Sequence, residues 1–284
     1  MSFKPSTKPR GPDFLVIGAQ RAGTSWVHFT LKRHPALWLP PIKEIHHFDN
    51  RRPGRNWTNA TRWRRVWGAR RGILDWWMID FLLGDGSDSW YARLFHEAQQ
   101  RGRTAGEITP AYATLTRESF CRIHKMNPQI KIIFIMRDPV ERAWSAVKRS
   151  SLKGKDSESE VAIENALKLA SRKQHRARSA YMETIKKIES VFPSSQLYFC
   201  FFDDLAAQPA NFVAGILSFL GVDAEEPTKI LQPAAISPFG ARPVPVKFER
   251  EMAKQHLPMI HELCDRFEGA PQRWLARYEK LSAA

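Results

Sequence analysis

Residues 14–35 read FLVIGAQRAGTSWVHFTLKRHP, and this stretch decides the fold. Its first five residues, 14–18, are apolar or small without alternation, which is typical of a strand covered on both faces in a parallel sheet. From Thr24 to Arg33 the pattern is helical, and Pro35 ends it. We therefore expect a buried strand that leads through a short loop into a helix.

The loop between this strand and helix, residues 18–25, contains two glycines five residues apart and closes on two hydroxyl side chains. Glycine lets the backbone approach a ligand, and the N–H groups at a helix start favour an anion. The loop therefore suits a phosphate-like group. It departs from the Walker A loop, G-x-x-x-x-G-K-[ST], because Thr24 follows Gly23 where lysine is required, and the cation is Arg21 instead. Taken alone, the loop could equally be an ordinary tight turn.

The composition limits the classes of protein and partner. The chain has 284 residues with 44 basic and 29 acidic side chains, a formal charge of +15, which implies a nucleotide, polyanion, nucleic acid or membrane surface as partner. The three cysteines are widely spaced, as expected in a reducing compartment. Residues 1–13 lack the apolar core of a signal peptide, and no later run reaches membrane-spanning length. We expect a soluble cytoplasmic protein with one domain, residues 1–284, and a flexible basic N-terminus at 1–13.

Strand and helix patterns alternate along the rest of the chain. The predicted strands are 104–108, 131–136 and 197–202. The predicted helices are 88–100, capped by Asp88 or Ser89, 117–126, 160–171, 179–191, 209–220 and 247–267. This alternation predicts an α/β fold, a three-layer P-loop-like domain with a central parallel sheet flanked by helices. Its ligand should lie beyond the carboxyl ends of the strands.

A second strand leads directly into a helix after residue 136. Asp138 stands at the expected N-cap and Pro139 at the first helical position. Arg137 lies at the joint and Ser145 two turns into the helix, so a guanidinium and a hydroxyl could converge on one anion. A kinase does not need this second anion site. A protein that binds a nucleotide with phosphates at both ends of its ribose does need it.

Residues 50–88 break the alternation of strands and helices. Between residues 51 and 71 there are eight arginines and no acidic residue, with tryptophans interleaved. This segment could be an amphipathic insertion that packs its indoles on the core. It could also be a lid that gives acceptor specificity through aromatic rings beside cations.

Four stretches resemble the sulfotransferases that use 3′-phosphoadenosine 5′-phosphosulfate (PAPS), most closely the branch of the glycosaminoglycan enzymes and their bacterial relatives. Residues 18–25 are similar to the family's 5′-phosphosulfate loop, and residues 43–49, KEIHHFD, to its acceptor-side segment. Residues 106–112 resemble the short strand beside that segment, and residues 137–145 the 3′-phosphate site. The resemblance covers about residues 14–220, apart from residues 51–86.

The resemblance implies transfer of a sulfuryl group from PAPS to a hydroxyl or amine of a small-molecule or saccharide acceptor. Neither a metal nor nucleic acid nor stable membrane insertion is implied. A C-terminal loop, residues 237–246, is expected to fold over the nucleotide. The residues implied in nucleotide binding are Arg21, Ala22, Gly23, Thr24, Ser25, Arg137, Ser145, Gly240 and Arg242.

Glu44 is the predicted general base, and Arg21 is predicted to neutralise charge on the transferred group. His46 could orient Glu44 or be the base itself, because an imidazole suits proton transfer near neutral pH. Glu44 could instead be a strand-end carboxylate paired with Lys43 or a nearby arginine. A metal site at His46 and His47 is a poor alternative, since adjacent side chains diverge in an extended chain.

Two positions depart from the family pattern. Arg21 stands where many members carry lysine, although the tyrosylprotein sulfotransferases are similar in using arginine. Ile108 stands where the glycosaminoglycan 3-O-sulfotransferases carry lysine, which argues against a heparan-like acceptor. Two other functions stay open: a nucleotide kinase with a degenerate P-loop, and a basic module that binds single-stranded nucleic acid.

Overall fold

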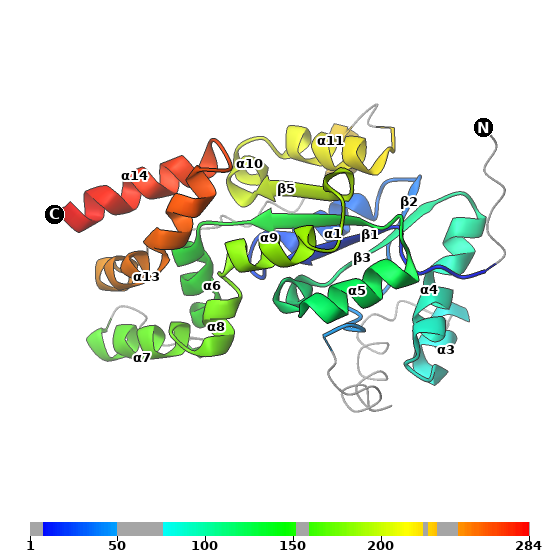
Figure 1. Ribbon diagram of the computed structural model, residues 1–284, viewed down its shortest axis with the longest axis horizontal. Helices are drawn as coiled ribbons and strands as arrows, with labels where there is room; N and C mark the ends of the chain where they lie inside the picture. Colours follow the sequence, from blue (N-terminus) through cyan, green and yellow to red (C-terminus); the bar gives the residue numbers. More distant parts are fainter. Residues whose placement is uncertain (1–7, 50–75, 152–158, 224–226, 232–243, 284) are drawn as a thin grey trace.

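The computed structural model describes residues 8–49, 76–151, 159–223, 227–231 and 244–283 (Figure 1). The strands are β1 (Phe14–Gly18), β2 (Leu37–Trp38), β3 (Thr104–Ile108), β4 (Lys131–Met136) and β5 (Leu197–Phe201). They form one sheet in the order β2-β3-β1-β4-β5, and all neighbouring strands are parallel. The predicted α/β class with a parallel sheet is confirmed.

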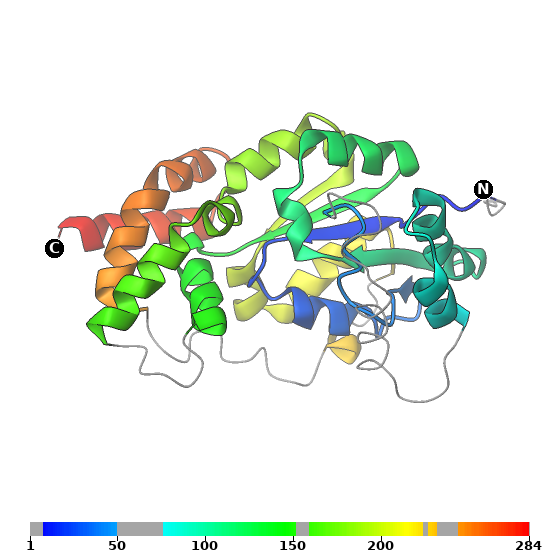
Figure 2. The same cartoon turned by 90° about the horizontal axis from the view of Figure 1, so that it is seen from below.

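Helices cover both faces of this sheet. The helices are α1 (Thr24–Leu31), α3 (Trp76–Leu83), α4 (Asp88–Gln100), α5 (Arg117–Met126), α6 (Pro139–Ser151), α7 (Glu160–Ala170), α8 (Lys173–Ala177), α9 (Tyr181–Glu189), α10 (Phe202–Ala207), α11 (Pro209–Leu220), α12 (Pro227–Ile230), α13 (Val246–Cys264) and α14 (Ala270–Ala283). The helices α5 and α9 lie on one face of the sheet, and α1 and α11 lie on the other (Figure 2). The three predicted layers are therefore present.

The central strand β1 fixes where a ligand can bind. Its residues Phe14 to Ile17 have no exposed surface, which explains why the strand is apolar without alternation. After β1 the chain continues to β2, and β2 and β3 lie on one side of β1 in the sheet. The connection from β3 then crosses β1 to β4, which lies on the opposite side of β1. Such a switch point opens a crevice at the carboxyl ends of the strands. Both predicted strand-to-helix junctions, after β1 and after β4, end there.

Three local predictions were wrong. The N-cap of α4 is Ser87 rather than Asp88 or Ser89, since the Ser87 hydroxyl accepts from the N–H of Trp90 at 3.1 Å. Residues between the predicted helices 160–171 and 179–191 form the short helix α8. The predicted helix 247–267 ends earlier, at Cys264, and Gly269 with φ of 89° makes a turn into α14, which was not predicted.

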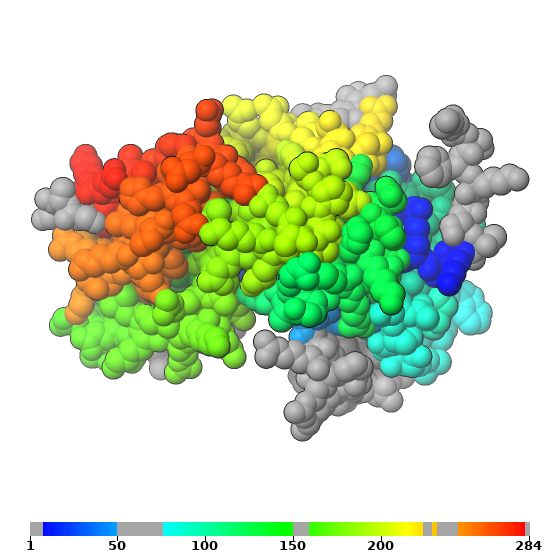
Figure 3. Space-filling view, in the orientation of Figure 1, coloured from blue at the N-terminus to red at the C-terminus, as the bar shows by residue number. Residues whose placement is uncertain are grey.

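The helices α13 and α14 form a hairpin, and their orange and red surface lies at one end of the molecule (Figure 3). There α13 packs on α6, α7 and α9. The ring centroids of Phe248 in α13 and Trp144 in α6 are 5.0 Å apart. Tyr278 of α14 is completely buried. The hairpin is therefore part of the hydrophobic core around α6, the helix that carries the second anion junction.

Three segments singled out in the sequence, residues 1–13, 50–88 and 237–246, are described only in part. At the end of the basic N-terminus, Asp13 accepts from the N–H of Ala105 at 2.8 Å, which joins residues 8–13 to the sheet. Of the 50–88 segment, residues 50–75 lie outside the described residues, and α3 packs on α4 through Trp77, which donates to the carbonyl of Leu94 at 2.9 Å. Of the expected nucleotide-covering loop only 244–246 are described, so Gly240 and Arg242 lie outside.

Across the described ranges, we find no helix with the length and apolar character needed to traverse a bilayer. The three cysteines are free thiols, and Cys200 is buried in β5. The cytoplasmic location stays a prediction.

Candidate active site

The 18–25 loop turns sharply between β1 and α1. Arg21 and Gly23 have positive φ values of 71° and 76°, and Gly23 occupies the N-cap of α1. A Cβ atom on Gly23 would lie 2.6 Å from the Leu205 side chain, so both the backbone angle and the space favour glycine. Thr24 is buried, whereas Ser25 is exposed beside it at the start of α1. The loop thus presents N–H groups at a helix start, as expected for an anion site.

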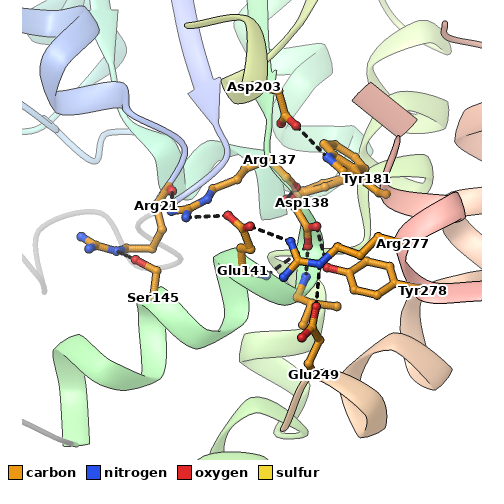
Figure 4. Close-up of polar contacts among 12 residues, drawn as sticks. Arg21, Arg137, Asp138, Glu141, Ser145, Tyr181, Asp203, Glu249, Arg277 and Tyr278 are labelled. Atoms are coloured by element: carbon orange, nitrogen blue, oxygen red, sulfur yellow. Dashed lines mark hydrogen bonds and ion pairs between the residues drawn. The ribbon is translucent and has the colours of Figure 1, made fainter. Parts of the chain in front are cut away.

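The two predicted anion junctions meet in the structure (Figure 4). Arg21 donates from Nε to the Ser145 hydroxyl at 3.0 Å, and Arg137 donates from Nη1 to the carbonyl oxygen of Arg21 at 3.1 Å. Burial lowers the pKa of Arg21, and the positive charges of Arg149 and Arg137 lower it further. Like charges held this close favour a bound anion.

The Arg137 side chain is nearly immobilised by its neighbours. It is 4% exposed, its guanidinium lies 4.7 Å from the centre of the Phe202 ring, and Nη2 contacts Glu141 Oε2 at 2.9 Å. Its carbonyl oxygen accepts from the Tyr181 hydroxyl at 2.7 Å. One guanidinium nitrogen, Nε, is buried without a hydrogen-bond partner among the described residues. The arginine is therefore positioned before any ligand arrives.

Asp138 is the N-cap of α6, as predicted. Its Oδ1 accepts from the N–H groups of Val140 at 2.9 Å and Glu141 at 3.1 Å, and its Oδ2 accepts from the Tyr278 hydroxyl at 2.5 Å. Burial raises the pKa of Asp138 to about 6. These contacts fix the first turn of α6, and with it the direction of the side chains of Arg137 and Ser145.

Arg142 has a different place from its neighbours in the 137–145 stretch. It is 1% exposed, donates from Nε to the Ser179 hydroxyl at 2.6 Å, and donates from Nη2 to the carbonyl of His175 at 3.2 Å. Burial lowers its pKa to about 10. Arg142 thus joins α6 to α8 and to the connection between α8 and α9. No local pattern signals this contact, because the partners are more than thirty residues away.

The 43–49 segment lies next to the 18–25 loop. Lys43 donates from Nζ to Glu44 Oε1 at 2.8 Å and to the Ser25 hydroxyl at 3.2 Å. The pairing of Glu44 with Lys43, weighed from the sequence, is therefore present, and the same lysine reaches the start of α1. The contact between Lys43 and Ser25 was not predicted from the sequence. The only signal for a role of Lys43 was its position beside Glu44.

His46 lies between two carboxylates. It donates from Nδ1 to Asp49 Oδ2 at 2.7 Å, and its Nε2 is 3.5 Å from Glu44 Oε2. Burial alone would lower the pKa of His46, but the bonds to Asp49 and Glu44 outweigh it and raise the pKa to about 9. Burial alone would raise the pKa of Glu44, but His46 and Lys43 lower it to about 2. At neutral pH, Glu44 is therefore ionised and His46 is protonated, so the two side chains carry opposite charges.

The neighbouring His47 points elsewhere. Its Nε2 bonds to Asp88 Oδ1 at 2.7 Å, and its ring stacks on Tyr91 with centroids 4.3 Å apart. Burial lowers the pKa of His47 to about 4. Within the part of the chain that is described, no three His, Cys, Asp or Glu side chains gather in a way that could hold a metal ion.

Glu107, at the end of β3, holds the backbone of the 43–49 segment. It is 1% exposed and its Oε1 accepts from the N–H of Ile45 at 2.9 Å. Burial raises its pKa, and it also accepts from the hydroxyls of Tyr91, Thr109 and Tyr112. Ile45 lies between Glu44 and His46, whose φ values are 62° and 58°. The buried carboxylate therefore supports a backbone shape that these residues rarely adopt.

Comparisons with known proteins show what the chain is similar to in sequence and in fold. The chain is 31% identical over 219 residues to heparan sulfate glucosamine 3-O-sulfotransferase 6 of Homo sapiens, over 75% of this chain and 53% of that protein. The chain spans about half the length of such relatives. In fold it is similar to a sulfotransferase from Alicyclobacillus acidocaldarius, with a TM-score of 0.62 at 23% identity over 92% of this chain and 98% of the other. A sulfotransferase domain from the curacin biosynthetic pathway gives a TM-score of 0.55 at 17% identity, over 79% and 78%.

A sequence model described as "Sulfotransferase family" matches residues 12–226. This range holds both strand-to-helix junctions and the 43–49 segment, and it ends before α13 and α14. The chain therefore belongs to the sulfotransferase family.

Proposed function

We propose that this protein transfers a sulfuryl group from PAPS to a hydroxyl or amine of an acceptor, giving adenosine 3′,5′-bisphosphate. The observation that carries the proposal is the meeting of two anion junctions at the carboxyl ends of the adjacent strands β1 and β4. Arg21 of the first junction contacts both Ser145 and Arg137 of the second. PAPS is a nucleotide with anionic groups at both its 5′ and 3′ positions, and it suits such a pair of sites.

In this proposal, the 18–25 loop binds the 5′-phosphosulfate through Arg21, Ala22, Gly23, Thr24 and Ser25. Arg137 and Ser145 bind the 3′-phosphate. A contribution from Gly240 and Arg242 remains a prediction, since they lie outside the described residues.

The chemistry is an in-line displacement at sulfur. A bond forms between the acceptor oxygen or nitrogen and sulfur, and the bond between sulfur and the 5′-phosphate oxygen breaks. Glu44 takes the acceptor proton, while His46, held by Asp49, keeps the Glu44 carboxylate in place. Arg21 and Lys43 neutralise the sulfuryl oxygens and the leaving phosphate, an assignment supported by their contacts with Ser145 and Ser25. Positioning and charge neutralisation are the main contributions a protein makes to such a loose transition state.

The acceptor is a small molecule or a saccharide in this proposal. The heparan sulfate relative supports a saccharide hydroxyl as one candidate. Ile108, at the end of β3, argues against a heparan-like chain, since it replaces the lysine of the glycosaminoglycan 3-O-sulfotransferases. A kinase is disfavoured because Thr24 occupies the place of the Walker A lysine. In a kinase, the second anion junction at Arg137 would also have no ligand.

Ligand-induced stabilisation tests the proposal. Adenosine 3′,5′-bisphosphate should raise the Tm well above the effect of adenosine 5′-monophosphate, and ATP with magnesium should have little effect, because only a true ligand stabilises the native state. Release of adenosine 3′,5′-bisphosphate from PAPS, screened over saccharides, phenols and amines, then identifies the acceptor. Stabilisation by ATP with magnesium but not by the bisphosphate would favour the kinase instead.

A further inference from the structure

Glu141 bridges two arginines from distant parts of the chain. Its Oε2 is 2.9 Å from Arg137 Nη2, and its Oε1 is 3.0 Å from Arg277 Nη1. Arg277 in turn donates from Nε to Glu249 Oε1 at 2.6 Å. The four side chains therefore alternate in charge from the α6 junction to the C-terminal hairpin (Figure 4). We name this series the charge chain Arg137–Glu141–Arg277–Glu249.

Half of this charge chain lies outside the matched family region. Glu249 belongs to α13 and Arg277 to α14, whereas the family match ends at residue 226. The hairpin therefore adds groups directly behind the arginine to which the proposed function assigns the 3′-phosphate. The next residue, Tyr278, bonds to Asp138 and fixes α14 against the same helix start.

Glu141 opposes anion binding where it stands. Its carboxylate lies against one edge of the Arg137 guanidinium, so a phosphate that approaches this guanidinium meets a like charge. Arg277 neutralises that carboxylate from its other oxygen, and Glu249 holds Arg277 from behind. Arg277 thus reduces the repulsion that Glu141 would exert on a phosphate at Arg137.

Glu141 also has room to move. Its side chain is 31% exposed and lines a cavity of about 880 Å³ at the carboxyl end of β5, together with Phe202, Asp203 and Arg273. Arg137, by contrast, is packed on Phe202 and fixed through its second nitrogen to the Arg21 carbonyl. A ligand can therefore displace Glu141 from Arg137 while Glu141 keeps its contact with Arg277.

We propose that Glu141 is an internal competitor of the 3′-phosphate for Arg137, and that Arg277 is a positioning residue that draws Glu141 away and thereby sets 3′-phosphate affinity. This inference rests on the proposed function, since it assigns the 3′-phosphate to Arg137. It gives the C-terminal hairpin a part in nucleotide recognition.

Binding of two nucleotides tests the inference. Isothermal titration measures the Kd of adenosine 3′,5′-bisphosphate and of adenosine 5′-monophosphate for the full chain and its variants. Arg277→Met should weaken the bisphosphate about fivefold, the scale of one partly exposed ion pair, and leave the monophosphate unchanged. Glu141→Gln should tighten the bisphosphate by a similar factor. In the Glu141→Gln background, Arg277→Met should no longer weaken it, because the repelling charge is gone.

Two variants serve as controls. Lys254→Met removes a positive charge from the same hairpin, but Lys254 pairs with Glu251 at 3.0 Å, away from Glu141, so both nucleotides should keep their affinity. Arg277→Lys keeps the charge and should bind the bisphosphate nearly as the wild type does. This variant and Glu141→Gln still test the inference if Arg277→Met does not fold.

Equal weakening of both nucleotides by Arg277→Met would show that Arg277 only supports the fold. Weaker bisphosphate binding in Glu141→Gln would show that Glu141 orients Arg137 rather than competes for it. Either result overturns the inference. A wild type that binds the bisphosphate no more tightly than the monophosphate contradicts the proposed function itself, so the two failures are distinguishable.

Discussion

At the scale of single residues, the protonation states of Glu44 and His46 characterise the site. Glu44 is ionised because His46 and Lys43 outweigh the effect of burial on its pKa. His46 is protonated because Asp49 and Glu44 outweigh burial in the opposite direction. The two side chains therefore carry opposite charges at neutral pH, and their roles as base and positioning residue stay a prediction.

Replacement of Glu44 tests its role directly. Glu44→Gln keeps the size of the side chain but removes the base, so turnover should fall by about a hundredfold or more. The affinity for adenosine 3′,5′-bisphosphate should stay close to that of the wild type, because no nucleotide contact is assigned to Glu44. The measurements are release of the bisphosphate from PAPS with the acceptor found by screening, and titration calorimetry. A variant that keeps most of its rate removes Glu44 from the role of base.

The stability of the protein should depend on pH through His46. Its pKa is raised to about 9 in the folded protein from an ordinary value of 6.5. Its contribution to the free energy of unfolding is therefore fully present below pH 6.5 and is lost as the pH rises through 9. Urea unfolding of the wild type and His46→Gln should show a difference at about pH 6 that shrinks by about pH 9.5. A constant difference across this range would contradict the charged pair.

The sequence predicts which residues belong to the site better than it predicts which residues contact one another. Arg21, Arg137 and Ser145 were predicted to serve anions, and the structure brings them together. The contacts of Lys43 with Ser25 and of Glu107 with Ile45 depend on how the 43–49 segment packs against α1 and β3, and no spacing in the sequence indicates that. The role of each residue in catalysis stays a prediction.

At the scale of elements, two strand-to-helix junctions carry the site. Continuous apolar runs identified β1 and β4, because strands buried on both faces have no polar alternation. The caps of the helices were predictable where a proline followed, as after Asp138, and not at α4, where Ser87, Asp88 and Ser89 are adjacent candidates. The five residues of α8 are too few to show a helical period.

The loop after β1 gives a prediction at this scale. Gly23→Ala places a side chain at positive φ and against Leu205, so the free energy of unfolding should fall by about 1–2 kcal/mol from the backbone conformation alone. Nucleotide binding should weaken as well, because the N–H groups at the start of α1 move. Urea denaturation and titration with adenosine 3′,5′-bisphosphate measure the two effects.

Gly102→Ala is the matched control for this variant. Gly102 also has a positive φ, 73°, but a Cβ added there would meet no atom of the described residues within 4 Å. It should therefore lose stability through the backbone alone and keep its affinity for the bisphosphate. Unchanged nucleotide affinity in Gly23→Ala would contradict a role of the 18–25 loop in binding.

At the scale of the whole molecule, the family region and the C-terminal hairpin meet at α6. Of this hairpin only α13 was predicted, as a helix over residues 247–267, and α14 was missed. Its contacts with Asp138 and Glu141 join residues more than a hundred positions apart. Such contacts follow from tertiary packing, which local periodicity does not encode.

A crystal structure with adenosine 3′,5′-bisphosphate is the most direct measurement of the central claim, that the two junctions bind opposite ends of one nucleotide. We predict the 5′-phosphate at the N–H groups of residues 22–25, and the 3′-phosphate within hydrogen-bond distance of Arg137 and Ser145. A nucleotide bound with its 3′-phosphate away from both side chains would contradict the account.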